Sequence, residues 1–232
     1  MHATRKNVFI TGGTGYLGRP LISRLLERGH SVRALVRPGS ERKLPAGCIA
    51  VPGDALDAPS YAAQIPPADT FVQLVGVAHP SPSKGDQFRS IDLVSATGAI
   101  KAASRADVKH FVYLSVAHPA PMMKSYIAVR MECEALLRES KMNATIVRPW
   151  YVLGPGHRWP YAIIPLYWLC GLIPATREGA QRLGLVTLKQ MILALANAVE
   201  QPATGVRIAG VPEIRRGAGF IQLPPADPAT SG

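Results

Sequence analysis

A glycine-rich turn near the N-terminus constrains the fold more than any other feature of the sequence. The stretch "VFITGGTGYLGRP", residues 8–20, joins a short apolar run to a segment with leucines at helical spacing. Val8, Phe9 and Ile10 are typical of a strand that is buried on both faces. Glycine is favoured where a backbone must turn tightly or approach another group closely, because it has no β-carbon. The predicted order is therefore strand, glycine turn and helix.

The spacing of the glycines indicates what this turn can bind. Gly12, Gly15 and Gly18 recur every third residue, so that main-chain amides at the start of the helix can point at an anion, which the helix dipole also favours. A dinucleotide pyrophosphate fits this role, and a second strand, "SVRALVR", completes the expected βαβ unit. A glycine-rich connector without a ligand is the alternative.

The motif also resembles a known one. "TGGTGYLG" is similar to the T-G-x-x-G-x-x-G turn of the extended and atypical short-chain dehydrogenase/reductase superfamily. The resemblance implies a nicotinamide cofactor held by the residues of the turn, which are Thr11, Gly12, Gly13, Thr14, Gly15, Tyr16, Leu17 and Gly18. It extends to Arg37, to the segment around Tyr126 and to Arg148 with Pro149. These features are similar to NmrA-type regulators and to the nucleotide-binding accessory subunit of respiratory complex I.

Strand and helix patterns alternate through the first 150 residues, which predicts an α/β fold of Rossmann type, a doubly wound parallel sheet. After the first strand, the predicted strands are "SVRALVR", "CIAVPGD", "TFVQLVG", "HFVYLS" and "ATIVRP". The crossover helices are expected near residues 16–28, 57–65, 86–106 and 122–140. Residues 1–150 then form the NAD(P)-binding domain.

The pattern changes after Trp150, where prolines and glycines interrupt the chain. We expect a small C-terminal cap on the substrate side over residues 151–216, with an amphipathic helix over residues 187–200. Thr187 and Gln190 have the spacing of a capping box at its start. Residues 217–232 are rich in Pro, Gly and Ala and are expected to form a flexible tail.

Composition excludes several classes of protein. The formal net charge is +11, but the basic residues are scattered and show no aromatic interleaving, so no nucleic-acid partner is expected. Cys48, Cys133 and Cys170 lack CxxC spacing, which favours neither a metal site nor a disulfide framework. The chain enters its first strand almost at once, which predicts a cytoplasmic protein without a signal peptide. Residues 161–175 are apolar but too short to span a bilayer, so a cap helix is expected there, with contact to a membrane surface as an option. The oligomeric state is not predicted.

The residues after the second and third strands predict which nicotinamide cofactor is bound. Arg37 follows the second strand, about 20 residues beyond the glycines, where an acidic residue would hold the ribose of NAD. An arginine there can pair with a 2′-phosphate, and Arg42 and Lys43 can add charge, so NADP is favoured over NAD. Asp54, beside Ala55, resembles the aspartate of the superfamily that hydrogen-bonds the adenine amino group; capping the next helix is its alternative role.

Two further segments complete the predicted cofactor site. Val75 and Gly76 are similar to the turn that passes under the cofactor's ribose, and Pro149 belongs to the stretch that closes over the nicotinamide. His79, in the loop after Gly76, stays unassigned.

Catalysis in this superfamily depends on a tyrosine and on a lysine four residues later. The resemblance places Tyr126 and Arg130 at these positions, with arginine in place of the lysine. Arg130 would then support proton donation by Tyr126 and contact the cofactor. The serine that orients the substrate is replaced by Ala117, so Ser115 or Ser125 would have to substitute for it. A tyrosine and an arginine on one helix face and structural hydroxyls are the non-catalytic alternatives.

Three functions are compatible with these residues. The first is NADP-dependent reduction of an apolar carbonyl or quinone, and the second is a non-catalytic NADPH-binding redox sensor or structural subunit. A nucleotide-sugar epimerase or dehydratase is less favoured, because such enzymes carry a larger C-terminal domain. An aromatic surface in the predicted cap would line the substrate pocket or form the core of the cap; it comprises Trp159, Tyr161, Tyr167, Trp168 and Leu169.

Overall fold

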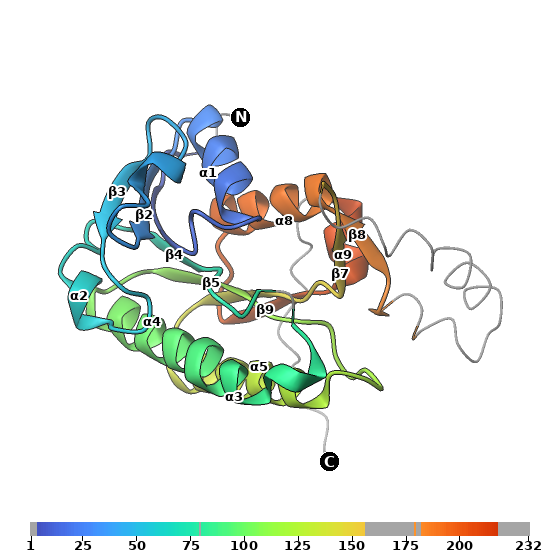
Figure 1. Cartoon of the computed structure of the whole chain (residues 1–232). Coiled ribbons are helices and arrows are strands. Elements are labelled where there is room, and N and C mark those ends of the chain that lie inside the picture. The colour runs from blue at the N-terminus through green and yellow to red at the C-terminus, as the bar shows by residue number, and fades with distance from the viewer. Residues whose placement is uncertain (1–3, 79, 156–178, 180–181, 218–232) are drawn as a thin grey trace, which may run out of the picture.

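A seven-stranded parallel sheet forms the centre of the molecule (Figure 1). The computed structural model describes residues 4–78, 80–155, 179 and 182–217 of the chain. The strands of the sheet are, in spatial order, β3 (Ile49–Pro52), β2 (Ser31–Val36), β1 (Asn7–Thr11), β4 (Thr70–Gln73), β5 (His110–Leu114), β6 (Ala144–Val147) and β9 (Val206–Ala209). The chain runs outward from β1 to β3 and then returns to place β4 on the other side of β1. This reversal between β1 and β4 is the topological switch point at which doubly wound sheets bind their ligands.

Helices cover both faces of the sheet, as Figure 1 shows. One face carries α1 (Gly18–Glu27), α8 (Leu188–Glu200) and α9 (Val211–Arg216), whereas the other carries α2 (Pro59–Ala62), α4 (Val94–Arg105) and α5 (Lys124–Glu139). The short turns η1 (Glu41–Lys43), η2 (Pro82–Lys84) and α3 (Gly85–Gln87) lie in the connections, and the π-helical turn η3 (Phe88–Leu93) leads into α4. The predicted Rossmann-type fold is therefore confirmed.

Alternating strand residues separate two hydrophobic cores. Val8 and Ile10 of β1 face the α1–α8 side, whereas Phe9 faces the α4–α5 side. Phe9 stacks on Phe71 and Phe71 on Phe111, each pair with ring centroids 5.2 Å apart, so that one aromatic row crosses three strands. A continuous apolar run, without a polar face, is what a sheet covered on both sides requires.

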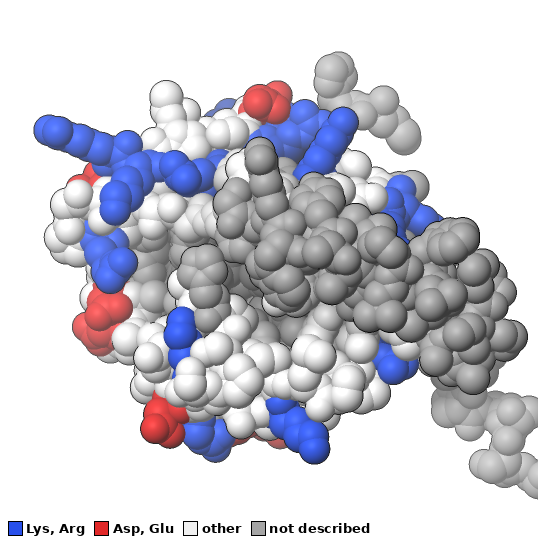
Figure 2. All heavy atoms as spheres, turned by 45° about the vertical axis from the view of Figure 1, so that its right-hand side comes forward, with Lys and Arg blue, Asp and Glu red and all other residues white. Residues whose placement is uncertain are grey.

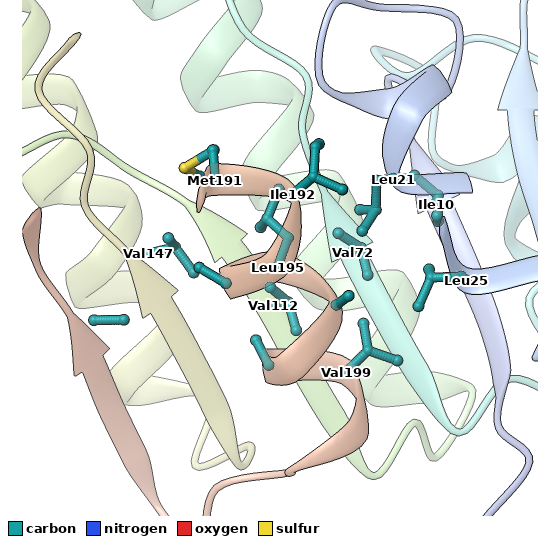
Figure 3. Close-up of a cluster of buried hydrophobic side chains, with 14 of the residues drawn as sticks. Ile10, Leu21, Leu25, Val72, Val112, Val147, Met191, Ile192, Leu195 and Val199 are labelled. Carbon is teal, nitrogen blue, oxygen red and sulfur yellow. The ribbon is translucent and has the colours of Figure 1, made fainter. Parts of the chain in front are cut away.

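Helix α8 completes the core on the other face. Figure 3 shows Met191, Ile192, Leu195 and Val199 projecting from α8 among the sheet and α1 side chains. The helix begins at the predicted capping box, in which the main-chain N–H of Gln190 donates to the Thr187 hydroxyl over 3.2 Å. Its apolar face therefore serves the central sheet.

The C-terminal part of the chain differs from its predicted role as a cap. Both α8 and β9 lie between residues 151 and 216, yet α8 covers the sheet beside α1, and β9 pairs with β6 as its seventh strand. Strand β9 has the sequence VRIA, in which half of the residues are exposed, so no buried apolar run marked it. Outside the main sheet, β7 (Tyr151–Leu153) pairs in parallel with β8 (Leu185–Thr187).

Several expectations fall outside the described residues: the helix at residues 161–175, the aromatic surface from Trp159 to Leu169, the role of His79 and the tail after residue 217. In the part of the chain that the structure describes, every helix is too short or too polar to cross a membrane.

Candidate nucleotide-binding and active site

The glycine turn is packed so tightly that side chains are excluded from it. Gly12 adopts φ +75°, and a β-carbon there would lie 3.0 Å from the carbonyl carbon of Leu74. A β-carbon on Gly18 would overlap the carbonyl oxygen of Gly12, which itself accepts the Gly15 amide over 3.0 Å. Helix α1 begins with Leu17 as N-cap and has no side-chain cap and no acidic residue in its first turn. Its positive dipole end therefore has no acidic partner within its own first turn, and such an end favours a bound anion.

The turn lies against the segment that follows β4, which is the other side of the switch point. Gly12 packs on Leu74 and Val75, and the next residue, Gly76, packs on Arg130, since a β-carbon on Gly76 would overlap Nη2 of that arginine. The structure therefore brings together the glycine turn, the segment after β4 and the candidate catalytic helix α5.

Thr11, the first residue of the motif, has an internal role for its side chain. It is 1% exposed, and its hydroxyl donates to the side-chain oxygen of Gln73 on β4. The Gln73 amide in turn donates to Ser95 over 3.2 Å. The hydroxyl thereby ties β1 to β4 and α4 beneath the turn, so Thr11 would act on a nucleotide only through the backbone position.

The residues predicted to contact the adenosine half follow β2 and β3. Arg37 is exposed directly after β2, as are Arg42 and Lys43 in η1. Asp54 is also exposed, and its Oδ1 accepts the Leu56 amide over 3.0 Å, so one carboxylate oxygen already stabilises the local turn. Ala55 follows and is half-buried. Because parallel strands end at one edge, Arg37 and Asp54 lie at the same rim.

Arg130 is held by a buried network. It is 4% exposed, and its Nη2 lies 2.5 Å from Asp92 Oδ1. Its Nη1 donates to the Tyr113 hydroxyl over 3.2 Å and to the Leu114 carbonyl over 2.8 Å. Burial by itself would lower the pKa of Arg130, but the field of Tyr113, Tyr126 and Asp92 raises it well above its ordinary value. The guanidinium therefore stays charged and fixed beside Gly76.

Tyr126 lies one helical turn before Arg130 and is half-buried. The guanidinium carbon of Arg130 lies 5.1 Å from its ring centroid, which is a cation–π contact. The ring of Phe88 packs against the Tyr126 ring, with the two centroids 4.9 Å apart and the two planes at 54°. Burial raises the pKa of the neighbouring Tyr113 well above its ordinary value, so that Tyr113 remains a neutral phenol. Tyr126 is thus the more accessible phenol beside the buried cation.

Ser115 is engaged with a second buried group. Its hydroxyl donates to Glu134 Oε1 over 2.6 Å, and Glu134 is also held by Arg148, whose Nε donates to Oε1 over 2.9 Å. Burial would raise the pKa of Glu134, but the hydrogen bonds from Arg148 and Ser115 lower it below its ordinary value. Ser115 therefore orients Glu134, while Ser125 is exposed and Ala117 is buried. The main-chain carbonyl of the buried Pro149 accepts the Ala117 amide over 2.8 Å.

Sequence reasoning missed Asp92, Tyr113 and Glu134. A signal for Asp92 was available, since an acidic residue in "FRSIDLVSA" interrupts an apolar pattern and a buried arginine requires a partner. The described residues contain no cluster of three His, Cys, Asp or Glu side chains that would hold a metal ion.

These features define a nucleotide-binding α/β domain, and comparison with known proteins identifies its family. A family model described as NAD(P)H-binding matches residues 12–158, and the chain belongs to this family. The predicted membership of the short-chain dehydrogenase/reductase superfamily is thereby confirmed.

Several curated proteins are similar to the chain. A ceramide reductase of Caulobacter vibrioides is 30% identical over 157 residues, which cover 64% of this chain and 47% of that protein. The photosystem II assembly factor Ycf39 of Trieres chinensis is 29% identical, over 61% of this chain and 44% of that protein. A 3-diazoavenalumate denitrifying reductase of a Streptomyces species is 26% identical, over 85% and 73%. The match covers less than half the length of several of these curated relatives, the ceramide reductase and Ycf39 among them.

Solved structures share the fold. The enzyme WbmH of Bordetella bronchiseptica, determined in complex with NAD+, has a TM-score of 0.66 at 23% identity, covering 87% of this chain and 75% of its own. A short-chain dehydrogenase/reductase superfamily protein of Agrobacterium tumefaciens with bound NAD has a TM-score of 0.65 at 17% identity, covering 88% and 77%.

Proposed function

We propose that this protein is an NADPH-dependent reductase that acts on a carbonyl or quinone-like substrate. The observation that carries the proposal is the placement of Tyr126 on the guanidinium of Arg130, which itself packs on Gly76 next to the glycine turn. A proton donor beside a fixed cation at the nucleotide site is the arrangement that reduction of a carbonyl needs. The reductases among the similar proteins support the same class of reaction.

The residues of the chain divide the work as follows. The glycine turn and α1 would bind the pyrophosphate, and NADPH, when bound, supplies the hydride. Tyr126 would hold the substrate oxygen and donate its proton as negative charge develops there. Arg130 would stabilise the phenolate that remains, because its charge is held within 5.1 Å of the ring.

NADP is proposed over NAD because of the charges around the end of β2. Arg37, Arg42 and Lys43 are exposed there, and an arginine pairs with a phosphate through charge-assisted hydrogen bonds. The acidic residue that would favour the free ribose of NAD is absent from position 37.

A specific observation favours a second candidate, a non-catalytic NADPH-binding protein. Arg130 forms a buried ion pair with Asp92 and also donates to Tyr113 and Leu114. The guanidinium nitrogens of an arginine with these partners are already engaged, so this arginine can contact a phenol or a ribose less readily than the lysine of the superfamily can. In that case Arg130 would stabilise the fold and the bound nucleotide would act as a structural or sensing ligand.

Turnover in matched tyrosine variants separates the two candidates. NADPH binding is measured by nicotinamide fluorescence, and NADPH oxidation is then followed with a panel of aldehydes, ketones and quinones. Tyr126→Phe should bind NADPH as the wild type does and lose roughly 100-fold or more in kcat, the scale of one general acid. Tyr61→Phe is the control, since Tyr61 is buried under β1 and its hydroxyl has no hydrogen-bond partner among the described residues.

The outcomes are distinct. Turnover that survives in Tyr126→Phe would remove Tyr126 as proton donor. Tight NADPH binding by the wild type without oxidation by any substrate of the panel would favour the non-catalytic candidate.

A further inference from the structure

A pocket of about 380 Å³ opens at the carboxyl ends of β5, β6 and β9. Its lining includes His118 after β5, Arg148 after β6 and Gly210 after β9, together with Arg182. The volume is in the range that holds small ligands. Three of the lining side chains are basic, which is unusual for a pocket that would take a neutral quinone or ketone.

Arg148 is held so that part of its guanidinium is available to this pocket. Its Nε donates to Glu134 Oε1 over 2.9 Å and its Nη2 donates to Glu134 Oε2. Its Nη1 has no partner among the described residues, and the side chain is 15% exposed. The fork of bonds to Glu134 fixes the guanidinium plane, so the remaining donor is oriented before any ligand arrives.

The two described carboxylates near the pocket, Glu134 and Glu213, already accept hydrogen bonds. Glu213 accepts the Gly210 amide over 3.0 Å and Arg216 over 2.7 Å. Glu134 is 1% exposed and accepts from Ser115 and Arg138 in addition to Arg148. Among the described residues that line the pocket, Arg148, Arg182 and His118 therefore accompany a single carboxylate, that of Glu213. On the face drawn in Figure 2, the Lys and Arg side chains that are in view lie in separate groups.

We infer that this pocket binds an anionic group, a carboxylate or a phosphate, of the molecule that the protein reduces. Arg148 Nη1 and Arg182 would bind the oxygens directly, with His118 as a third donor. The identification of the ligand as the substrate rests on the proposed function, whereas anion binding itself does not.

The connection to the candidate catalytic pair is direct along the chain. Helix α5 carries Arg130 and Glu134 one turn apart; Arg130 donates to the Leu114 carbonyl, and Glu134 accepts from Ser115. Ala117, two residues further along, already lines the pocket. A substrate anchored at Arg148 would therefore lie at the same strand end as the candidate proton donor.

His118 provides a readout that is independent of turnover. Burial, followed by the charge of Arg148, lowers its pKa, while Glu134 raises it and Arg138 lowers it further. Arg148 directly follows β6, Glu134 and Arg138 belong to α5, and Glu134 Oε1 lies 3.5 Å from His118 Nε2. A bound anion adds negative charge on the pocket side, so anion binding should raise the pKa of His118.

The experiment titrates the full chain with benzoate and, separately, with inorganic phosphate. Calorimetry reports binding, and the NMR signals of His118 report its pKa. Arg182→Gln and His118→Gln each remove one donor and leave the Glu134–Arg148 pair intact, whereas Arg105→Gln removes an exposed arginine at the end of α4 as a control.

The inference expects at least one of the two probes to bind, to raise the pKa of His118, and to bind roughly tenfold more weakly to the two pocket variants. Tighter binding of benzoate would indicate a carboxylate group and tighter binding of phosphate would indicate a phosphate group. It is overturned if neither probe binds, or if Arg105→Gln weakens binding as much as the pocket variants do.

A second arm links the pocket to the reaction. With an aromatic keto acid and its methyl ester as substrates, Arg182→Gln should raise KM for the acid and leave KM for the ester unchanged. An equal effect on both substrates would contradict the inferred role. Anion binding in the first arm without turnover of any substrate would refute the proposed function and leave the anion site standing.

Discussion

Arg130 lies with its guanidinium carbon 5.1 Å from the ring centroid of Tyr126, although it is anchored on its other side to Asp92 at 2.5 Å. At this position the superfamily uses a lysine, whose flexible ammonium makes point contacts, whereas the planar guanidinium makes several contacts in fixed directions. The ion pair therefore serves two purposes: it allows a charge to be buried under the phenol, and it fixes where that charge lies.

The first prediction concerns the stability of this ion pair. Arg130→Met leaves the buried Asp92 without its charged partner, with the Val77 amide as a remaining donor, and should reduce the free energy of unfolding by about 3–5 kcal/mol. The double variant Asp92→Leu/Arg130→Met removes both charges and should recover most of that loss. Urea unfolding of the wild type, the two single variants and the double variant measures the coupling.

Arg138→Met is the control for this series. Its side chain is 43% exposed and shares Glu134 with Arg148, so it should cost less than about 1 kcal/mol. Additive losses in the double variant would show that Asp92 and Arg130 do not stabilise each other.

A second prediction tests the glycine turn. Gly18→Ala places a β-carbon against the carbonyl oxygen of Gly12. That oxygen belongs to the backbone, so the overlap is relieved only if the turn itself moves. We expect NADPH binding to be lost and the free energy of unfolding to fall by roughly 1–3 kcal/mol, the scale of overpacking. Fluorescence titration and urea unfolding measure both effects.

Gly85→Ala is the matched control for Gly18→Ala. Gly85 has φ −49° and ψ −49°, and a β-carbon there meets no atom within 4 Å. This variant should bind NADPH as the wild type does. Normal binding by Gly18→Ala would mean that the turn is not a pyrophosphate site.

A third prediction addresses cofactor preference. Arg37→Asp reverses the charge at the end of β2 and should weaken the binding of NADPH roughly 10- to 100-fold, which corresponds to one charge-assisted hydrogen bond. The affinity for NADH should change little. Competition titrations with the two nucleotides give the ratio. Lys101→Asp makes the same change of charge on the exposed side of α4 and should leave the ratio unchanged. An equal loss of NADPH and NADH would contradict the role of Arg37.

The parts of the fold that could be predicted are those with strong local patterns. The glycine turn, six strands and the capping box at Thr187 each combine a hydrophobic period with a turn or cap residue. Strand β9 lacked such a pattern, because a strand at the edge of a sheet buries fewer of its residues. It is recruited by pairing with β6, which is a long-range contact that the local sequence does not encode.

The sequence could predict which residues belong to the candidate site, but not which partners these residues contact. The resemblance located Tyr126, Arg130 and Ser115, but the partners that decide what these residues do are distant in sequence. Asp92 forms an ion pair with Arg130 and so limits which other groups its guanidinium can contact. Glu134 accepts the hydrogen bond of the Ser115 hydroxyl. Whether two charges are buried as a pair depends on tertiary packing. The ion pair of Arg130 and the hydrogen bond of Ser115 could therefore be identified only in the folded structure.

The last prediction concerns stability at mildly acidic pH. His110 is fully buried on β5, where its Nε2 lies 3.0 Å from the Thr145 hydroxyl. Burial, with the charges of Arg207 and Lys6, lowers its pKa from 6.5 to about 4. The folded protein therefore binds a proton less readily than the unfolded chain, so folding is favoured above pH 6.5 and loses stability as the pH falls toward 4. The loss from this one group is on the order of 3 kcal/mol. His110→Gln cannot take up the proton, so its free energy of unfolding, measured by urea titration, should fall less steeply over this range, whatever its value above pH 7. Parallel curves for the two proteins would show that His110 is protonated as easily in the folded chain as in the unfolded one.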